Sequence, residues 1–426
     1  MSYGGVRDDF FNDLEKTNDG GYLLVGSSKS FGPDPDSFDG YIVRTDSSGN
    51  ELYSSTYFSV GDDAASFIRP SEDSCYYICF NSDIAPGIYR THLLKVNDTI
   101  GLVWDSDAFS AVNAYLYDGC FLPDGNFVAL GRMADSISIA IWFNDEGDTI
   151  MTKKLSSDDS LFFRRISYNN GSLTIVGYKI LQSVFVEAYD LSGSLISHYE
   201  KNVVFGNVSS CMNQNGILFN VKTFDPFAIR CSATDTISNL VLWQDTLGPM
   251  PNYLTAYNSS LYNENLMICG QAKLEDDTIG GYITVLDAQH GTLLLENYAR
   301  SNNTFFTCFN NARQFDGHIC AVGKQSGEAM DAILCKTDYN DIAGLRDDYF
   351  KILNLRIFPN PVDHDLFLSS GLSAKSHFRI YDCYGRIVKT GFAGNGAIDV
   401  GALANGIYVL QISVGKAVIS KTFIKD

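Results

Sequence analysis

The sequence predicts an all-β protein built from repeated sheet units, and three observations support this prediction. The 426 residues include 28 Phe and 24 Tyr, and such aromatic residues favour strands. The 37 glycines occur with Asn, Asp and Ser between short apolar runs, which indicates frequent turns. Apolar residues alternate over these short runs and show no extended helical period, so strands are expected throughout.

A two-part segment recurs from the N-terminus to about residue 340. In its first copy, "DGGYLLVGSS" (19–28) precedes "FDGYIVRTDSSGNELYSSTYF" (38–58), in which two strands flank a turn. Six looser copies follow, about 45–55 residues apart, and a further short strand such as "FFNDLEKT", "FFRRISY" or "FFTCFNN" precedes several of them. Each copy therefore offers about four strands, and stacked copies can cover faces that a single sheet leaves open. This pattern predicts a seven-bladed β-propeller.

Two kinds of position are shared by the copies. A glycine after an early strand is expected to let the chain leave the strand at a tight bend. It occurs at Gly26, Gly131, Gly177, Gly270 and Gly323. An acidic or amide residue is expected to stabilise the later turn. It occurs at Asp46, Asn97, Asn144, Asp190, Asp287 and Asp338.

The two ends of the repeat region are expected to meet. The seventh copy ends near Asp338 without a clear outer strand, whereas "SYGG" (2–5) resembles an outer strand without a blade of its own. We expect this N-terminal strand to close the last blade. The predicted organisation is a propeller over 1–340, a polar linker over 341–354 and a second domain over 355–426.

The C-terminal domain is predicted to be a small Ig-like β-sandwich. Short alternating strands are separated by turns every eight to twelve residues, which is typical of such sandwiches. "PNP" (359–361) is a stiff segment that cannot join a central strand, and "YGR" (384–386) lies at a hairpin.

This domain closely resembles the C-terminal sorting domain of the type IX secretion system of Gram-negative bacteria. The matching segments are "FPNPVDHDLFL", "IYDCYGRIVKTG", "IDVGALANGIYVLQI" and "SKTFIKD". The residues that carry the resemblance are Pro359, Asn360, Pro361, Gly385, Arg386, Gly406, Tyr408 and Lys421. The resemblance implies that the type IX machinery exports the protein, which is then released or anchored at the cell surface. The alternative is an Ig-like module that only caps the propeller. The first repeat also resembles the blades of bacterial extracellular propellers.

Charge and hydropathy exclude several classes of partner. The net charge of −19 argues against nucleic acid and anionic lipid as ligands, because both need a basic surface. No apolar run has the length of a membrane span. The N-terminal "MSYGGVRDDFF" lacks the pattern of a leader peptide, which cargo of this system should carry, so we expect a truncated or matured chain.

No catalytic constellation is recognised in the sequence. The six histidines form no HExxH motif, and GxSxG and P-loop motifs do not occur. The ten cysteines are scattered singly without the spacing of zinc ligands, and buried free thiols are expected. The sequence therefore predicts no metal and no cofactor.

Two sets of surface residues have functional as well as structural interpretations. Asp34, Asp36 and Asp39 share a loop and form a weak calcium candidate, although a solvated acidic turn explains them better. The triplet "DTI" and its variants are typical of turns, but they also resemble an O-glycosylation motif of bacteria with type IX secretion. The residues that would carry the glycans are Thr99, Ser136, Thr149, Thr236, Thr246 and Thr278. Three tryptophans, at 104, 142 and 243, are expected in blade cores rather than in sugar-binding platforms.

The leading functional hypothesis is an exported, non-enzymatic propeller that acts as a binding or adhesion scaffold for a glycan or protein. The alternative is a polysaccharide hydrolase or lyase whose site lies at the channel mouth, where loops of several blades converge. A third possibility is a structural spacer. A suitably separated carboxylate pair at the mouth would favour the enzyme, whereas exposed Tyr or Trp would favour a lectin.

Overall fold

The computed structural model divides the chain into two compact units, residues 1–337 and 338–426. The structure describes the chain apart from residues 58, 60, 107–112, 135–136, 157–159, 180–182, 203–207, 225–227, 248–253, 263–264, 274–277, 300–306, 317, 327–328, 339–356, 359, 369–376, 383–384, 393–396, 415–416 and 426. The expected linker 341–354 therefore lies outside the described residues. Every regular element among the described residues is a strand, as the sequence predicts.

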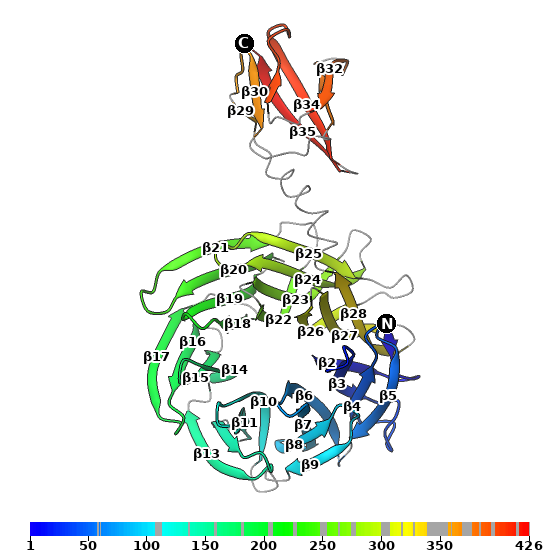
Figure 1. Cartoon of the computed structure of the whole chain (residues 1–426), viewed down its shortest axis with the longest axis vertical. Coiled ribbons are helices and arrows are strands. Elements are labelled where there is room, and N and C mark those ends of the chain that lie inside the picture. The colour runs from blue at the N-terminus through cyan, green and yellow to red at the C-terminus, as the bar shows by residue number, and fades with distance from the viewer. Residues whose placement is uncertain are drawn as a thin grey trace. The chain divides into compact units, whose positions relative to one another are not determined.

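The first unit consists of seven four-stranded antiparallel sheets arranged as a ring, which confirms the predicted seven-bladed β-propeller (Figure 1). Blade 1 contains β2 (Asp9–Lys16), β3 (Tyr22–Ser28), β4 (Asp39–Thr45) and β5 (Glu51–Tyr57). Blade 2 contains β6 (Asp62–Pro70), β7 (Cys75–Ala85), β8 (Ile88–Asn97) and β9 (Leu102–Ser106). Blade 3 contains β10 (Ala114–Phe121), β11 (Phe127–Met133), β12 (Ser138–Phe143) and β13 (Thr149–Ser156). Blade 4 contains β14 (Leu161–Asn169), β15 (Ser172–Lys179), β16 (Ser183–Tyr189) and β17 (Leu195–Asn202).

The remaining blades follow the same order. Blade 5 contains β18 (Val208–Met212), β19 (Ile217–Phe224), β20 (Ala228–Asp235) and β21 (Val241–Leu247). Blade 6 contains β22 (Leu254–Tyr262), β23 (Asn265–Lys273), β24 (Ile279–Asp287) and β25 (Leu293–Ala299). Blade 7 contains β26 (Thr307–Phe315), β27 (His318–Ser326), β28 (Met330–Asp338) and β1 (Ser2–Tyr3). In each blade the first of these strands lies nearest the centre of the ring (Figure 1).

The core of the propeller lies between neighbouring blades. The two middle strands of blade 1, β3 and β4, are buried along their whole length, whereas the outer strand β5 is mostly exposed. Leu23 and Val25 of blade 1 pack with Ile68 and Ile78 of blade 2, and similar clusters join most other pairs of neighbours. A blade thus buries both faces only when it is flanked by two others, which is why the repeats form a ring.

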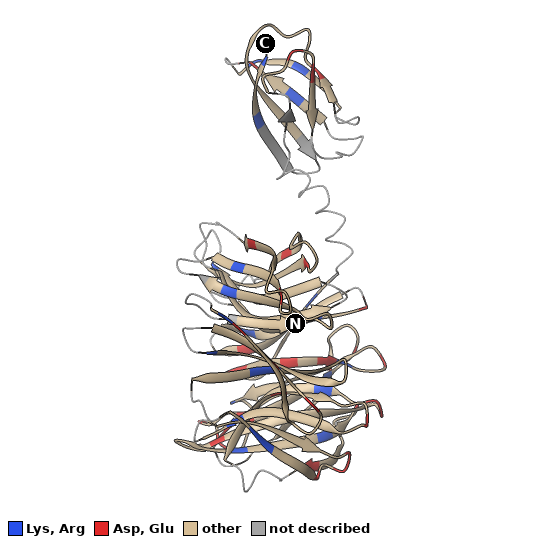
Figure 2. Cartoon of the chain, turned by 90° about the vertical axis from the view of Figure 1, so that its left-hand side faces the viewer, with Lys and Arg blue, Asp and Glu red and all other residues tan. Residues whose placement is uncertain are grey.

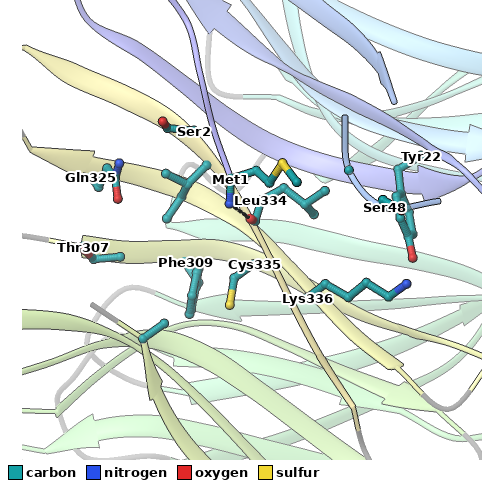
Figure 3. Close-up of a pocket in the computed structure, with 13 residues that line it drawn as sticks. Met1, Ser2, Tyr22, Ser48, Thr307, Phe309, Gln325, Leu334, Cys335 and Lys336 are labelled. Atoms are coloured by element: carbon teal, nitrogen blue, oxygen red, sulfur yellow. Dashed lines mark hydrogen bonds between the residues drawn. The ribbon is translucent and has the colours of Figure 1, made fainter. Parts of the chain in front are cut away.

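Blade 7 joins the two ends of the propeller. Its outermost strand is β1, in which Tyr3 pairs with Ala332 and Ser2 pairs with Ile333. The amino group of Met1 donates a hydrogen bond of 2.8 Å to the carbonyl oxygen of Leu334. Figure 3 shows this contact beside a cavity of about 540 Å³ that lies along the closing strand. The N-terminal residues therefore supply the fourth strand that β26, β27 and β28 lack.

The recurring turn residues act through Asx hydrogen bonds. The Oδ1 atom of Asp46 accepts hydrogen bonds from the amides of Ser48 and Asn50 at 2.8 and 2.9 Å. Asn97 and Asp190 make the same pair of contacts at the corresponding turns of blades 2 and 4. These contacts explain why Asp or Asn recurs at this position.

The recurring glycines have a different role from the expected one. Gly26 lies inside β3 and pairs with Phe11 and Tyr41, so the strand continues past it. A Cβ atom at Gly26 would lie 2.0 Å from the carbonyl oxygen of Phe10 on the inner strand. The same close approach occurs at Gly131, Gly177, Gly270 and Gly323. The glycine is needed because the inner strand approaches too closely for a side chain, and not because the chain turns there.

The second unit has two sheets around a shared core, which confirms the predicted small β-sandwich. One sheet contains β29 (Ile357–Phe358), β30 (Asp365–Leu368) and β33 (Ala397–Asp399). The other contains β32 (Ile387–Phe392), β31 (His377–Tyr381), β34 (Gly406–Val414) and β35 (Ala417–Lys425). Leu366 of the first sheet and Phe378, Leu410 and Phe423 of the second belong to one buried cluster. In the described part of the chain, no helix long and apolar enough to cross a membrane is present.

Candidate binding surface at the centre of the propeller

The inner strands share a bulge at the same level of the ring. The pairing between the first and second strands skips one residue in six blades. The skipped residues are Asn12, Ser66, Tyr117, Arg164, Tyr257 and Asn310. A bulge places two successive side chains opposite one partner residue and redirects them. The six bulges therefore bring six mostly polar or aromatic side chains to the centre of the ring.

A network of buried charges joins the inner strands just after the bulges. Asp13 of blade 1 accepts hydrogen bonds from Arg69 of blade 2 at 2.8 Å and from Arg313 of blade 7 at 3.0 Å. Asp118 of blade 3 also pairs with Arg69, and it accepts a hydrogen bond of 3.1 Å from the amide of Ile166 in blade 4. Burial raises the pKa of Asp13, but Arg313 and Arg69 outweigh burial and hold the pKa below its usual value.

The network continues around the ring through amides. Asn311 of blade 7 donates a hydrogen bond of 2.6 Å to Asp13, and Asn258 of blade 6 donates one of 2.8 Å to Asn311. Arg165 of blade 4 in turn donates to Asn258. Glu15 pairs with Arg313, although burial keeps the pKa of Glu15 above its ordinary value. The carboxylates at the centre are therefore engaged in holding blades together.

Aromatic and arginine side chains lie on the edge of the ring where the inner strands begin, which we call the upper edge. We name this group the aromatic–arginine ladder; it consists of Tyr89, Tyr115, Tyr117, Arg132, Phe162, Arg164 and Tyr178. The inner strand β10 supplies Tyr115 and Tyr117, and the inner strand β14 supplies Phe162 and Arg164. Arg132 comes from β11, Tyr178 from β15 and Tyr89 from β8. Cross-strand pairing aligns Tyr115 with Arg132 and Phe162 with Tyr178.

Ring and cation contacts connect the ladder across three blades. The Tyr89 ring of blade 2 lies 6.0 Å from that of Tyr115, which lies 5.3 Å from that of Tyr117. Arg164 of blade 4 lies over the Tyr117 ring at 4.7 Å.

The contacts between blades 3 and 4 run in both directions. Arg132 of blade 3 lies 4.0 Å from the ring centre of Phe162 in blade 4, while Arg164 reaches back over Tyr117. Phe162 and Tyr178 are stacked with ring centres 5.3 Å apart. Reciprocal cation–π contacts of this kind hold both arginines in defined positions on the surface.

Two phenols of the ladder, those of Tyr115 and Tyr117, stay neutral to a higher pH than a free tyrosine. Burial raises the pKa of Tyr115 and that of Tyr117. The charges that act on Tyr117 are those of Arg164 and Arg132. The ladder thus offers flat rings, hydroxyl groups and guanidinium groups on one surface.

The three aspartates of the calcium candidate are separated in the structure. Asp34 and Asp36 are exposed. The carboxylate of Asp34 accepts a hydrogen bond from the amide of Asp36, and the carboxylate of Asp36 pairs with Arg7 at 3.6 Å. Asp39 begins β4, is 1% exposed, and its Oδ2 atom has no hydrogen-bond partner among the described residues. Burial and the carboxylates of Asp63, Asp34 and Asp62 raise its pKa to about 6. Within the described ranges, no group of three or more His, Cys, Asp or Glu side chains is arranged to hold a metal ion.

The candidate glycosylation sites lie in different environments. Thr99 is exposed at the turn between the third and fourth strands of blade 2. Thr149 and Thr246 are exposed on the outer strands β13 and β21. Thr236 is half-buried and donates a hydrogen bond to the carbonyl oxygen of Gly216, while Thr278 lies just before β24. Ser136 lies outside the described residues.

Residues of the sorting motif hold the second unit together. Asn360 accepts a hydrogen bond of 2.8 Å from the amide of Ile424 and so ties the start of the domain to its last strand. Tyr408 donates a hydrogen bond of 2.7 Å to the carbonyl oxygen of Ala404 and stacks on Phe423.

Other motif residues shape a turn and two strands. Gly385 has a φ of 75° in the turn where Arg386 donates a hydrogen bond of 2.8 Å to Asp382. Gly406 begins β34, and Lys421 pairs with Leu410. Pro361 is exposed, and Pro359 lies outside the described residues.

The tryptophans join neighbouring blades. The indole nitrogen of Trp104 donates a hydrogen bond of 2.8 Å to the carbonyl oxygen of Asp145, and that of Trp243 donates one of 2.8 Å to Ala288. Trp142 is 4% exposed. These side chains therefore pack between blades and do not form an exposed platform.

Sequence reasoning missed the ladder, although the sequence contains a signal for it. In the inner strands, the alternation of apolar and polar residues is interrupted by pairs of adjacent residues that are both polar or that combine a tyrosine with a polar residue. These pairs are Tyr117–Asp118, Arg164–Arg165 and Asn310–Asn311. Such doublets mark bulges, because a bulge turns two successive residues away from the core.

Comparisons with known proteins support both parts of the fold. Residues 356–426 match a family model described as a secretion system C-terminal sorting domain. No curated protein matches the chain in sequence. The structure of the polysaccharide lyase Uly1 aligns with a TM-score of 0.51 at 10% identity and covers 79% of this chain and 91% of that one. A puromycin hydrolase aligns with a TM-score of 0.52 at 12% identity, covering 79% of this chain and 53% of that one.

Two longer proteins align over the whole chain. PorZ, a surface component of the type IX secretion system of Porphyromonas gingivalis, has a TM-score of 0.49 and 11% identity. The chain spans 60% of the length of PorZ and 59% of the extracellular domain of a putative one-component system from B. thetaiotaomicron. The alignments with Uly1 and the puromycin hydrolase bear on the fold alone. The matched C-terminal domain and the seven sheets together identify the chain as a secreted or cell-surface β-propeller protein with a type IX secretion system C-terminal sorting domain.

Proposed function

We propose that the protein is a binding or adhesion scaffold at the surface of a Gram-negative bacterium and that its ligand is a glycan. The observation that carries this proposal is the aromatic–arginine ladder on the upper edge of blades 2 to 4. Flat rings with a polar group at the rim suit sugars, which have apolar faces and hydroxyl edges. The sorting domain supports delivery of this surface to the outside of the cell through the type IX machinery.

The proposed contacts follow from the geometry of the ladder. Tyr117 and Phe162 are half-buried side chains on the upper edge. Arg164 lies over the Tyr117 ring, and Arg132 and Tyr178 lie against the Phe162 ring, so we propose that a sugar contacts the exposed edges of these rings. The hydroxyl groups of Tyr117 and Tyr178 and the guanidinium group of Arg164 lie near these rings and can donate hydrogen bonds. A few polar groups placed around apolar surface are typical of small-ligand sites.

The alternative, a polysaccharide hydrolase or lyase, receives less support. Such an enzyme needs an acid or base that can change its protonation state at the site. Among the described residues after the bulges, Asp13 and Asp118 share Arg69, and Glu15 pairs with Arg313. These carboxylates are engaged in joining blades, so we favour binding over catalysis.

A glycan array with the full chain tests the proposal. The variant Tyr117→Ala with Phe162→Ala should lose at least about tenfold in affinity for any glycan that the full chain binds, because it removes both aromatic side chains and the contacts that position Arg164 and Arg132. Tyr53→Ala, on the outer strand β5 of blade 1, is the control and should bind like the wild type. Melting curves show whether the variants remain folded. Absence of binding to every glycan on the array, or equal binding by the double variant and the control, would contradict the proposal.

A further inference from the structure

We infer that the lower edge of blades 4 and 5 is a docking surface for a segment of another protein that presents apolar side chains flanked by Lys and Arg. The lower edge is the edge at which third strands end and outer strands begin, opposite the aromatic–arginine ladder. The inference is carried by a bulge that recurs in the outer strands, by exposed aliphatic side chains in blades 4 and 5, and by the charge of the turns beside them. It adds a second ligand, of a different class, to the proposed function.

The outer strands share a bulge close to the residue at which they begin. In blades 1 to 6, the pairing between the third strand and the outer strand skips one residue there. The skipped residue is aliphatic in every case: Leu52, Val103, Ile150, Ile196, Leu242 and Leu294. The first five of these side chains are 46% to 60% exposed. Exposed aliphatic residues at the bulge are therefore a feature of the repeat.

Protection of the sheet edge does not explain why these residues are apolar. A bulge by itself hinders another strand from pairing with the edge, and polar or charged residues at the edge hinder such pairing as well. Other exposed positions of the outer strands are polar, as at Ser54, Ser55, Lys154, Gln244 and Asp245. Contiguous exposed apolar side chains mark a surface that a partner covers.

These side chains are most numerous in blades 4 and 5. We name this group the apolar rim patch; it consists of Leu195, Ile196, Ile237, Leu240, Val241 and Leu242, which are 43% to 89% exposed. The outer strands β17 and β21 follow each other around the outside of the ring (Figure 1). Tyr199 of β17 donates a hydrogen bond of 2.9 Å to Asn239, in the turn of blade 5 that also carries Ile237. The two halves of the patch are therefore neighbours on one surface.

The turns of the lower edge carry acidic residues and no basic ones. In blades 1 to 5, the segments 46–50, 98–101, 144–148, 190–194 and 235–240 join third and outer strands, and all of them lie within the described residues. They contain no Lys or Arg, and their acidic residues are Asp46, Asp98, Asp145, Glu146, Asp148, Asp190 and Asp235. The turns after the first strands of these blades also lack Lys and Arg and add Asp19, Glu72, Asp73 and Asp124. Figure 2 shows many of the acidic residues in turns along one edge.

Basic side chains from the strands reach this edge at several places. Lys95 pairs with Asp73 and Asp145, so its charge is used inside the propeller. Lys153 of β13 approaches the turn of blade 4 at Gly193, and Lys201 of β17 donates a hydrogen bond of 2.8 Å to Thr234. These cations are fewer than the carboxylates of the turns. The lower edge therefore attracts a partner with Lys and Arg around its apolar side chains.

Other occupants fit the apolar rim patch less well. A second copy of this chain would bring acidic turns against acidic turns, and each chain has a net charge of −19. Anionic lipid is repelled for the same reason. A sugar favours flat rings with free polar groups, whereas Tyr199 and Trp243 beside the patch use their polar groups in hydrogen bonds between blades.

Fluorescence anisotropy with three labelled peptides tests the inference. In the first peptide Leu and Lys alternate; the second has Glu in place of each Lys, and the third has Ser in place of each Leu. We expect the full chain to bind the Leu–Lys peptide at least about tenfold more tightly than either of the others, because only this peptide combines apolar side chains with positive charge. The affinity should fall as the salt concentration rises.

Variants locate the binding on the apolar rim patch. Ile196→Thr with Leu242→Thr should weaken binding of the Leu–Lys peptide by at least about tenfold. The matched control is Leu52→Thr with Val103→Thr, which changes the same bulge position in blades 1 and 2 and should bind like the wild type. Melting curves show whether the variants fold. If the patch variant does not, Ile237→Ser decides the outcome, because Ile237 is 89% exposed in a turn and its replacement should leave the fold intact.

Three results would overturn the inference. The first is equal binding of the Leu–Lys peptide and either of the other two peptides. The second is equal binding of the Leu–Lys peptide by the patch variant and the control. The third is a dimer of the full chain in sedimentation that the patch variant abolishes, since a second copy would then occupy the patch. Glycan binding by the patch variant should match that of the wild type, so failure of this inference leaves the proposed function untouched.

Discussion

At the residue scale, Asp39 shows how a single buried carboxylate can differ from its neighbours in sequence. It shares a loop region with the exposed Asp34 and Asp36, but its strand position buries it at the top of blade 1. A Cβ atom at Gly32 would lie 1.2 Å from the Oδ2 atom of Asp39, so Gly32 leaves room for this carboxylate. Burial, and then the neighbouring carboxylates, raises the pKa of Asp39 to about 6.

Asp39 should make the protein less stable as the pH rises. The unfolded chain releases this proton near pH 3.9, whereas the folded chain keeps it until about pH 6, so the folded state binds more protons between these values. The free energy of unfolding should therefore fall by about 1–3 kcal/mol from pH 4 to pH 7 through this group. Asp39→Asn should abolish this part of the pH dependence, as measured by urea unfolding at pH 4.5 and pH 7.

The neighbouring Asp36→Asn variant is the control for that measurement. Asp36 is exposed and is not among the groups that raise the pKa of Asp39, so its replacement should preserve the slope of the wild type. Identical slopes for the wild type and Asp39→Asn would show that the folded carboxyl group titrates like the unfolded one.

At the element scale, the inner strand explains both the recurring glycine and the binding surface. The bulge at Tyr117 moves the inner strand toward Gly131, where a Cβ atom would lie 2.4 Å from the carbonyl oxygen of Tyr115. The same bulge turns the Tyr117 side chain toward the centre of the ring. The bulge therefore accounts both for the recurring glycine and for the position of the Tyr117 side chain. The recurring glycine, which is visible in the sequence, thus also marks the level of the ring at which the candidate site lies.

The short strand β1 should contribute strongly to stability although it has only two residues. Tyr3 is 7% exposed, donates a hydrogen bond of 2.5 Å to the carbonyl oxygen of Gly49, and packs against Phe11 with ring centres 5.6 Å apart. Deleting residues 1–3 should lower the free energy of unfolding by about 3 kcal/mol or more, because a buried aromatic side chain and the strand pairing are both lost. Urea unfolding of the full-length and shortened proteins measures this difference.

A smaller change separates packing from hydrogen bonding in β1. Tyr3→Phe keeps the ring and loses only the contact with Gly49, so it should cost about 1 kcal/mol. Equal stability of the shortened protein and the wild type would show that blade 7 does not depend on the N-terminal strand.

At the scale of the whole molecule, the two units have separate cores and separate sheets. No sheet in the described part of the chain contains strands from both units. The cluster around Leu366 and Phe378 lies wholly in the second unit, while the clusters between blades lie in the first. Folding of the propeller therefore should not require the sorting domain.

A protein that ends at residue 338 should fold and bind like the full chain but should not be exported. Its melting temperature and its affinity for the glycan should match those of the intact propeller, because all seven sheets remain complete. In a bacterium with type IX secretion, the shortened protein should stay inside the cell, since the matched sorting domain is missing. Cell fractionation and a melting curve measure the two properties. Export of the shortened protein would show that the sorting domain is dispensable.

The sequence by itself determined the parts of this protein that depend on local patterns. Alternating apolar residues, the turn chemistry around residues such as Asp46, and the repeat spacing were enough to predict strands, blades and their number. The sequence motifs of the C-terminal segment were enough to predict the sorting domain. These features are local because each turn and each strand is stabilised by residues close to it in the chain.

Only the tertiary structure decided which residues form the candidate site. Tyr89, Tyr117 and Arg164 belong to three different blades, and no short pattern links them in the sequence. Packing of neighbouring blades brings them within contact distance, and Asp39 is buried in the folded propeller while Asp34 remains in solvent. Contacts between blades depend on how whole sheets pack, so the amino-acid types alone do not specify them.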